Sequence, residues 1–303
     1  MSNKKKIYMA GAGGMLGEAF YTVFEDKYEL KCTDIDVNDS WLEYLDFTDR
    51  DAYITDVIDF KPDYLFHIGA YTDLEYCEEH EDNTYITNTL AVENAVFASN
   101  KLDIPILYVS TAGIFDGNQE TYDDWDVPNP LGHYARSKYA GELFVQNNSS
   151  KHLICRAGWM MGAGPLKDKK FIQKIISQLK DGAQELFIVN DKLGTPTYTR
   201  DFANNVKLLL EKELWGLYNM VCGGMTGRFE VAQELLKILN LTESIKLTSV
   251  DSNHFKKEYF AERPPSERLI NSKLNLRNVN IMRDWKICLK EYLDEYYEGY
   301  LDK

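Results

Sequence analysis

Gly11-Ala12-Gly13-Gly14-Met15-Leu16-Gly17 lies between an apolar, β-rich run at Ile7–Ala10 and a helical run at Met15–Glu25. Glycine in such a turn lets the backbone bend tightly and approach a diphosphate, and the N-terminus of the following helix favours the negative charge. A strand, a glycine-rich turn and a helix in this order are typical of a dinucleotide-binding unit. The stretch therefore predicts a Rossmann-type βα unit at this point of the chain.

Short β-rich runs and helical stretches continue to alternate through the first half of the chain. Thr48 and Asp51 resemble a capping box, which predicts a helix that extends to about Phe60. The other expected strands are Leu30–Asp34, Tyr64–Ile68, Ile106–Ser110 and Leu153–Arg156, and the other expected helices are Asn83–Ser99 and Leu131–Asn147. Regular βα alternation predicts an α/β fold: a Rossmann-type doubly wound parallel sheet with a smaller, partly discontinuous α/β substrate-binding lobe.

The pattern changes after Arg156 to longer helices that are separated by irregular polar segments. The expected helices are Lys169–Lys180, Asp201–Glu211, Phe229–Leu239 and Asp284–Tyr297. We expect residues 1–156 to form the dinucleotide-binding Rossmann domain, with a return of the chain to it at 201–222. Residues 157–200 and 223–303 are expected to form mainly the substrate-binding lobe.

The composition of the 303-residue chain is that of a soluble globular protein, with 44% hydrophobic and 27% charged residues. A net charge of −14 argues against nucleic-acid binding, which needs a basic surface. The five cysteines are odd in number and form no CxxC motif, which favours a reducing compartment. Glycines interrupt the first apolar stretch, so we expect neither a signal peptide nor a membrane span, and a cytoplasmic location.

Asp34 follows Gly14 by 20 residues and ends the second expected strand. A carboxylate at this place accepts hydrogen bonds from the adenosine ribose and repels the additional phosphate of NADP. The cofactor is therefore expected to be NAD(H), with NADP(H) as the alternative, and Asp36 competes with Asp34 for the role. Asp46 and Phe47 are expected to face the adenine, although Phe47 could equally be a core residue.

Tyr134 and Lys138 stand four residues apart on an expected helix, so they share one of its faces. A nearby cation stabilises phenolate, so we expect Lys138 to lower the pKa of Tyr134 and make this phenol the general acid of a carbonyl reduction. Thr111 ends the preceding strand and can donate a hydrogen bond to the carbonyl, with Ser110 as the alternative. Asn88 can support Lys138, or serve its helix alone.

Further short sequence motifs are distributed over most of the chain. They are Ala70-Tyr71-Thr72, Ser110-Thr111 with Phe115-Asp116-Gly117, Pro128-Asn129-Pro130-Leu131, Gly141-Glu142, Arg156 to Trp159, Asp191, Gly194-Thr195-Pro196-Thr197-Tyr198, Arg200-Asp201, Arg263-Pro264, Asn271-Ser272-Lys273-Leu274 and Trp285. With the glycine turn and the Tyr–Lys pair, they resemble the extended short-chain dehydrogenases/reductases and, within these, the dTDP-4-dehydrorhamnose reductase family.

The resemblance implies a nucleotide sugar bound between two lobes and a hydride transferred to carbon 4 of a 6-deoxyhexose. Its catalytic positions match Thr111, Tyr134 and Lys138. The expected cofactor-binding residues are Gly11, Gly13, Gly14, Met15, Leu16, Asp34, Asp46, Phe47, Gly69, Ala70, Tyr71, Asn88, Tyr134 and Lys138. The expected substrate-binding residues are Thr72, Phe115, Trp159, Thr197 and Tyr198, together with Arg228 and Arg263 at the pyrophosphate, for which Arg268 is a third candidate.

The chain departs from the family pattern beside the expected catalytic threonine. The family usually has Asp-Tyr-Val-Phe-Asp-Gly after Ser-Thr, whereas this chain has Ala112-Gly113-Ile114-Phe115-Asp116-Gly117. The change removes a carboxylate and an aromatic ring from the neighbourhood of Thr111. Sequences also differ at His67-Ile68-Gly69, at Leu74-Glu75-Tyr76 and at Pro165-Leu166-Lys167-Asp168, so the identity of the sugar is less defined than the type of reaction.

Two other functions remain open from the sequence. One is a non-catalytic nucleotide-binding regulatory subunit, against which the intact Thr111, Tyr134 and Lys138 argue. The other is a sugar-nucleotide epimerase of the same superfamily that uses its cofactor transiently. The five histidines show no ligand spacing, so we expect no metal site. The sequence does not decide the oligomeric state, and a homodimer is the assembly that we consider.

Overall fold

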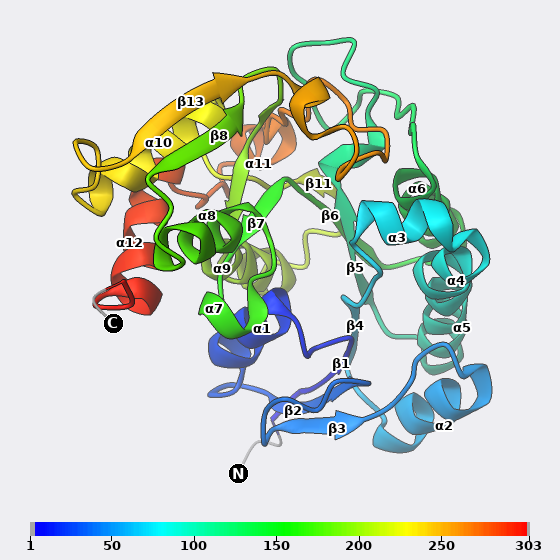
Figure 1. The fold of residues 1–303 in the computed structure, drawn as a ribbon. Coiled ribbons are helices and arrows are strands. Elements are labelled where there is room, and N and C mark those ends of the chain that lie inside the picture. Colours follow the sequence, from blue (N-terminus) through cyan, green and yellow to red (C-terminus); the bar gives the residue numbers. More distant parts are fainter. Residues whose placement is uncertain (1–3, 302–303) are drawn as a thin grey trace.

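A seven-stranded parallel sheet forms the centre of the computed structural model, which describes residues 4–301 (Figure 1). Its strands, in spatial order, are β11 (Gly216–Asn219), β6 (His152–Ala157), β5 (Ile106–Thr111), β4 (Tyr64–His67), β1 (Lys6–Ala10), β2 (Glu29–Asp34) and β3 (Leu42–Tyr44). The chain proceeds in one direction from β1 to β3 and in the other from β4 onward. A ligand crevice is therefore expected at the carboxyl ends of β1 and β4, where the order reverses.

Helices cover both faces of this sheet, as a doubly wound fold requires. One face carries α1 (Met15–Phe24) and α9 (Thr199–Glu211), which pack against each other. The other face carries α2 (Arg50–Phe60), α5 (Ala91–Leu102) and α6 (His133–Asn148). Each face has its own core, because the strand side chains alternate between the two layers.

Two details of the first half differ from the sequence predictions. The predicted Thr48–Asp51 capping box is wrong: Asp49 caps α2, since its carboxylate accepts a hydrogen bond from the Ala52 amide at 3.1 Å. Thr48 instead donates its hydroxyl to Asp46. The helix expected at 83–99 is divided into α4 (Glu81–Tyr85), a π-helical segment at Ile86–Leu90, and α5.

A smaller lobe follows β6. The sequence predicted irregular connections between the helices of this lobe, but several of these segments form short strands. Its strands form three pairs: β7 (Trp159–Met161) with β10 (Pro196–Tyr198), β9 (Leu193–Gly194) with β12 (Thr226–Gly227), and β8 (Glu185–Val189) with β13 (Lys246–Val250). Its helices are α7 (Gly164–Lys167), α8 (Phe171–Lys180), α10 (Arg228–Ile238), α11 (Ser272–Leu276) and α12 (Trp285–Tyr297), whereas α3 (Leu74–Glu79) precedes α4 in the first half. Strands of two to five residues are too short to give a clear alternation in sequence.

The chain returns to the large sheet after the first part of the small lobe. β11 pairs with β6 in register, and α9 lies on α1. This arrangement is consistent with the predicted return at 201–222, while the division of the chain into domains at residue 156 stays a prediction.

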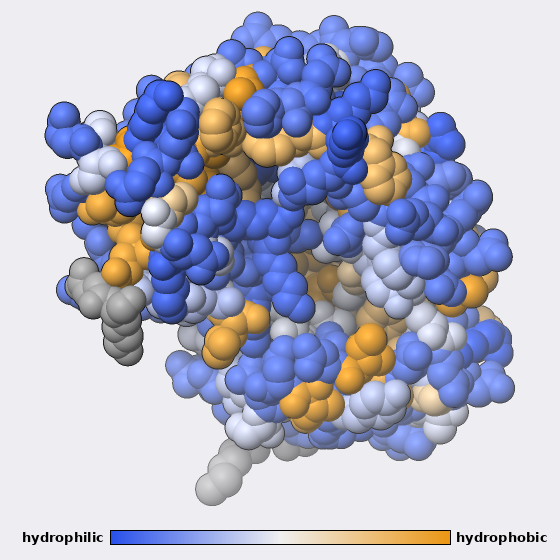
Figure 2. Space-filling view, viewed as in Figure 1, coloured by the Kyte–Doolittle hydropathy of each residue, from blue (hydrophilic) through white to orange (hydrophobic). Residues whose placement is uncertain are grey.

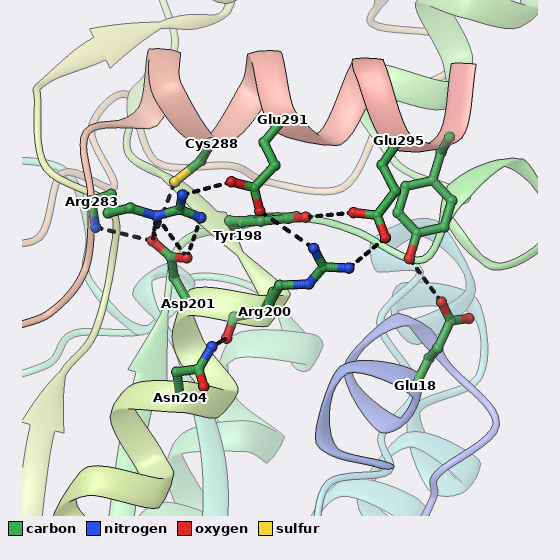
Figure 3. A network of polar contacts seen from close by, with 10 residues as sticks. Glu18, Tyr198, Arg200, Asp201, Asn204, Arg283, Cys288, Glu291 and Glu295 are labelled. Atoms are coloured by element: carbon green, nitrogen blue, oxygen red, sulfur yellow. Dashed lines mark hydrogen bonds and ion pairs between the residues drawn. The ribbon is translucent and has the colours of Figure 1, made fainter. Parts of the chain in front are cut away.

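A network of ion pairs and hydrogen bonds fastens the C-terminal helix α12 to α9 and α1 (Figure 3). Arg283 donates to both carboxylate oxygens of the buried Asp201, at 2.7 to 3.1 Å. Arg200 on α9 donates to Glu295 on α12, and the Tyr296 hydroxyl donates to Glu18 on α1. These contacts hold the end of the described chain on the large lobe.

No helix within residues 4–301 is both long enough and apolar enough to span a membrane. All five cysteines are buried, and their thiols are free.

Candidate active site

A pocket of about 600 Å³ lies between the large sheet and the small lobe, at the carboxyl ends of β1 and β4. Figure 2 shows the molecule hollowed between the two lobes, with hydrophilic side chains around the opening. The volume lies in the range of small-molecule sites, and the position is the crevice that the strand order predicts. The pocket is therefore the candidate active site.

The glycine turn forms the part of the pocket at the N-terminus of α1. Gly11 has a φ of +80°, and a Cβ added to it would lie 2.1 Å from the Cα of Gly69. A side chain is thus excluded by both the backbone conformation and the neighbouring loop. At Gly14, the N-cap of α1, a Cβ would meet no atom of residues 4–301 within 4 Å. The helix N-terminus is consequently open toward the pocket, as a diphosphate needs.

Asp34 lines the pocket at the end of β2 and also fixes the glycine turn. Its Oδ2 accepts a hydrogen bond from the Gly13 amide at 2.8 Å, and its Oδ1 accepts one from the Asp36 amide at 2.9 Å. Each carboxylate oxygen has a second lone pair, so Asp34 can still accept from a ribose hydroxyl. Asp36, the competing residue, is exposed outside the pocket lining.

Phe47 is both a pocket residue and a core residue. The centre of its ring lies 5.0 Å from the centre of the His67 ring. The ring packs against the core on the face of the sheet that α2 and α5 cover. The same ring fills the space where a Cβ of Gly69 would lie, at 2.4 Å. Phe47 is therefore a core residue that also lines the pocket, while its contact with the adenine stays a prediction. Asp46 lines the pocket next to it.

Asn88 lies behind the pocket wall, where it is fully buried in the π-helical segment. It accepts a hydrogen bond from the Tyr71 amide at 2.8 Å and donates to the Tyr71 carbonyl and the Ser137 hydroxyl, both at 3.1 Å. Asn88 thus connects the loop after β4 to α6, next to Lys138. A π-helical turn at such a place is common at functional sites.

Thr111 and Tyr134 meet on the pocket surface. The Thr111 hydroxyl accepts a hydrogen bond from the Gly113 amide at 3.1 Å, and its hydrogen bond with Tyr134 lowers the pKa of the phenol. Burial has the larger effect and raises the pKa of Tyr134 to about 12. The expectation that this pKa is lowered is wrong, because enclosure of the phenol outweighs its stabilising neighbours.

Lys138 lies one turn after Tyr134, with only 4% of its surface exposed. Burial lowers the pKa of its ammonium to about 7, against an opposing effect of Glu142. Its Nζ lies 4.2 Å from the centre of the Tyr108 ring, whose hydroxyl donates to the Lys138 carbonyl at 2.9 Å. The lysine is thus held rigidly at the pocket, close to the midpoint of its titration at neutral pH.

The small lobe contributes a connected group of three side chains to the opposite wall. The Arg228 guanidinium lies 3.7 Å from the centre of the Trp159 ring, and the Trp159 Nε1 donates to Glu267 at 2.7 Å. Burial lowers the pKa of Arg228 to about 10, and Glu267 acts against this effect. All three side chains line the pocket.

Two further cations lie at the rim of the pocket. Arg263 forms a two-pronged ion pair with Glu75 of α3, at 2.7 and 2.8 Å. Lys170 donates to the carbonyl and the hydroxyl of Thr72, at 3.0 and 2.8 Å, and burial lowers the pKa of its ammonium. With Arg228, they supply positive charge at the side where a phosphate could enter.

The structure brings most of the predicted residues to this one pocket. Those in its lining are Gly11, Gly14, Met15, Leu16, Asp34, Asp46, Phe47, Gly69, Ala70, Tyr71, Thr72, Thr111, Tyr134, Lys138, Trp159, Arg228 and Arg263.

Besides Asp36, six other candidates lie outside the lining. Gly13 and Asn88 stand behind it, and Arg268 points to the Thr226 carbonyl and to Glu120. Phe115, Thr197 and Tyr198 are almost fully buried. Phe115 stacks on Tyr122, whereas the Thr197 hydroxyl accepts from the Gly158 amide.

Lys170 and Glu267 are the charged pocket residues that sequence reasoning missed. Neither stands in a motif that marks a ligand. Each reaches the pocket only because the small lobe folds back over the sheet, so no local pattern could have found them.

Comparisons with known proteins agree with this geometry. The family model described as RmlD substrate binding domain matches residues 5–298. The solved structure of dTDP-4-dehydrorhamnose reductase from Yersinia enterocolitica is 31% identical, has a TM-score of 0.87, and covers 97% of this chain and 100% of its own. This chain belongs to the dTDP-4-dehydrorhamnose reductase family. The family and the fold class predicted from the sequence are thereby confirmed.

Two further relatives extend the comparison within the family. The solved dTDP-4-dehydrorhamnose reductase from Bacillus anthracis, in complex with NADP, is 26% identical, has a TM-score of 0.88, and covers 96% of this chain and 99% of its own. The spore coat polysaccharide biosynthesis protein SpsK of Bacillus subtilis is 25% identical over 292 residues, which are 96% of this chain and 97% of SpsK.

Proposed function

We propose that this protein reduces the 4-keto group of a nucleotide-linked 6-deoxyhexose with a nicotinamide cofactor. The observation that carries the proposal is the meeting of Thr111, Tyr134 and Lys138 in the pocket into which the glycine turn opens. The dTDP-4-dehydrorhamnose reductases of Yersinia enterocolitica and Bacillus anthracis, which cover nearly the whole chain, support the same reaction.

The three side chains divide the work of a carbonyl reduction. A bound, reduced nicotinamide supplies the hydride. Thr111 and Tyr134 orient the carbonyl oxygen by hydrogen bonds, and Tyr134 transfers its hydroxyl proton to this oxygen as the C=O bond becomes C–OH. A phenol whose pKa is about 12 is protonated at neutral pH, and the alkoxide that it meets is the stronger base, so the transfer is favourable. Lys138 in its charged form then stabilises the phenolate.

The pocket fits a dinucleotide in two respects. The open N-terminus of α1 and the glycine turn would hold the diphosphate, and Asp34 would accept from the adenosine ribose. Ser110 lines the pocket beside Thr111, and its buried hydroxyl has no hydrogen-bond partner among residues 4–301.

NADH is the expected cofactor, because the Asp34 carboxylate repels the 2′-phosphate of NADPH. The test is the ratio of kcat/KM for NADH to that for NADPH in the wild type and in Asp34→Ser. We expect the variant to shift this ratio at least about 10-fold toward NADPH, as removal of one unfavourable charge contact implies. An unchanged ratio would show that Asp34 acts only on the glycine turn.

The regulatory-subunit and epimerase alternatives are separated from reduction by stoichiometry. The purified protein is offered NADH and a panel of dTDP-, UDP- and GDP-linked 4-keto-6-deoxyhexoses, and the products are read by NMR. Reduction consumes one NADH for each alcohol formed. Epimerisation without net consumption, or no turnover with any sugar, would contradict the proposal.

A further inference from the structure

Glu267 is brought to the reaction centre by a part of the chain far in sequence from the glycine turn and the Tyr134–Lys138 pair. Its amide donates to the Leu193 carbonyl at 2.8 Å, which fixes the backbone against β9. Its Oε2 accepts from the Trp159 Nε1 at 2.7 Å. The Trp159 ring in turn lies against Gly194, where a Cβ would come within 2.2 Å of it. The contact with β9 and the Trp159 ring therefore hold the carboxylate in one position.

The second carboxylate oxygen faces Thr111 and Tyr134. A Cβ built on Gly113 would lie 3.3 Å from the Glu267 Oε1, 3.5 Å from the Thr111 Oγ1 and 3.9 Å from the Tyr134 Cε1. These three groups thus surround the space that the glycine leaves. A longer side chain at this position would compete with Glu267 for it.

The departure from the family pattern at Ala112-Gly113 explains why Glu267 can lie beside Thr111. The usual Asp-Tyr after Ser-Thr is Ala112-Gly113 in this chain, so the carboxylate and the ring of that segment are both absent. Loss of the ring opens the space, and Glu267 brings a carboxylate back to the same neighbourhood from the small lobe.

We propose that Glu267 determines substrate specificity by accepting a hydrogen bond from the 3-hydroxyl group of the sugar. The inference rests on the proposed function. Carbon 4 of a 4-keto-6-deoxyhexopyranose is flanked by carbon 3, which bears a hydroxyl, and by carbon 5, which bears a methyl group and the ring oxygen. A carboxylate beside the residues that hold the carbonyl meets one hydroxyl donor there, because a carboxylate accepts and does not donate.

Arg228 keeps the carboxylate in place without consuming the free oxygen. Its guanidinium stacks on Trp159 at 3.7 Å and attracts Glu267. The Oε1 is thus oriented before the sugar binds, which reduces the entropy lost on binding. The site favours a neutral sugar with a 3-hydroxyl and disfavours one with a carboxylate near carbon 4.

The test is a double-mutant-type cycle, in which one change is made in the enzyme and the other in the substrate. The kcat/KM of the wild type and of Glu267→Ala is measured with a dTDP-4-keto-6-deoxyhexose and with its 3-deoxy analogue. A hydrogen bond to a charged acceptor implies that each single change lowers kcat/KM about 10- to 100-fold. Both changes together should lower it no further, since they remove the same contact.

Independent effects that multiply would overturn the inference and leave the proposed function standing. A wild type that reduces no sugar of the panel would overturn the proposed function, and the inference with it. If the alanine variant does not fold, Glu267→Gln repeats the cycle, because it keeps an oxygen for Trp159 while removing the charge. Its preference for the 3-hydroxyl sugar should fall as well, and an unchanged preference would contradict the inference.

A purely structural role of Glu267 is distinguished by two further variants. Trp159→Phe removes the indole donor to Oε2 but keeps the carboxylate and its backbone contact with Leu193, so we expect the preference for the 3-hydroxyl to weaken without disappearing. Loss of this preference in Trp159→Phe would favour a structural role. Glu262→Gln, in the same segment but exposed outside the pocket lining, is the matched control and should keep the preference.

Discussion

At the scale of a single residue, the buried Lys138 serves the chemistry of the active site but lowers the stability of the folded protein. A lysine with 4% of its surface exposed must lose most of its hydration, and burial lowers its pKa to about 7. The unfolded chain keeps the ordinary value near 10.5. Between these two values the unfolded state binds one proton more than the folded state, so the stability contributed by this site rises with pH.

Lys138→Met should therefore stabilise the protein at pH 7 while abolishing activity. The stabilisation should shrink by about 1.4 kcal/mol for each pH unit from about 7 to 10.5, because one proton separates the two states of the wild type. Denaturant unfolding at several pH values measures the difference, with the exposed Lys151→Met as control. A difference that does not change with pH would show that folding leaves the pKa of Lys138 near its ordinary value.

The candidate site residues that line the pocket stand in local sequence patterns. The glycine turn and the Tyr134–Lys138 pair need only a strand, a turn and one helical face to be recognised. Glu267 and Lys170 could not be predicted, since they approach through the pairing of small-lobe strands and through loop contacts. The raised pKa of Tyr134 was missed for a similar reason, because burial is a property of the whole fold.

At the scale of elements, the attachment of α12 depends on charge pairs that are partly buried. Asp201 is 5% exposed and accepts from both the side chain and the amide of Arg283 (Figure 3). The Cys288 thiol donates to the same carboxylate at 3.3 Å. Removal of the arginine would leave this carboxylate buried with too few donors.

Arg283→Ala should lower the free energy of unfolding by about 1–3 kcal/mol, less than for a fully buried pair because the arginine side chain is 39% exposed. Urea unfolding measures the loss. Lys290→Ala, which breaks the exposed Lys290–Asp294 pair on the same helix, should stay within about 0.5 kcal/mol of the wild type. Equal effects of both variants would contradict a special role of Asp201.

Element prediction was accurate where the sequence pattern is long. The helices α1, α6 and α12 begin and end within two residues of their expected bounds, because each continues over at least 10 residues. The two- and three-residue strands of the small lobe gave no such signal. The π-helical segment at Ile86–Leu90 was also missed, since it changes the helix by a single residue.

At the scale of the whole molecule, the two lobes share one core. The largest cluster of buried apolar residues contains Met9 and Phe20 of the large lobe together with Leu289 and Tyr292 of α12. Apolar burial is the main stabilising contribution in folding, so neither lobe can lose its structure without exposing the core of the other.

We expect the protein to unfold in a single cooperative transition. Differential scanning calorimetry should give a van't Hoff enthalpy equal to the calorimetric enthalpy, as for a two-state domain. NADH should move the whole transition upward, by about 2.7 kcal/mol of stability at 100 times its Kd. Two separate transitions, of which NADH moves only one, would contradict a shared core.

The central claim is that this pocket reduces a sugar ketone with Tyr134 as the acid. The most direct measurement compares the wild type, Tyr134→Phe and Tyr139→Phe in NADH oxidation with the best sugar of the panel, alongside NADH binding by calorimetry. Tyr139 lies on the same helix but outside the pocket lining. The account predicts that only Tyr134→Phe loses about 10²- to 10⁴-fold in kcat while NADH binding persists. A Tyr134→Phe variant with wild-type turnover would contradict it.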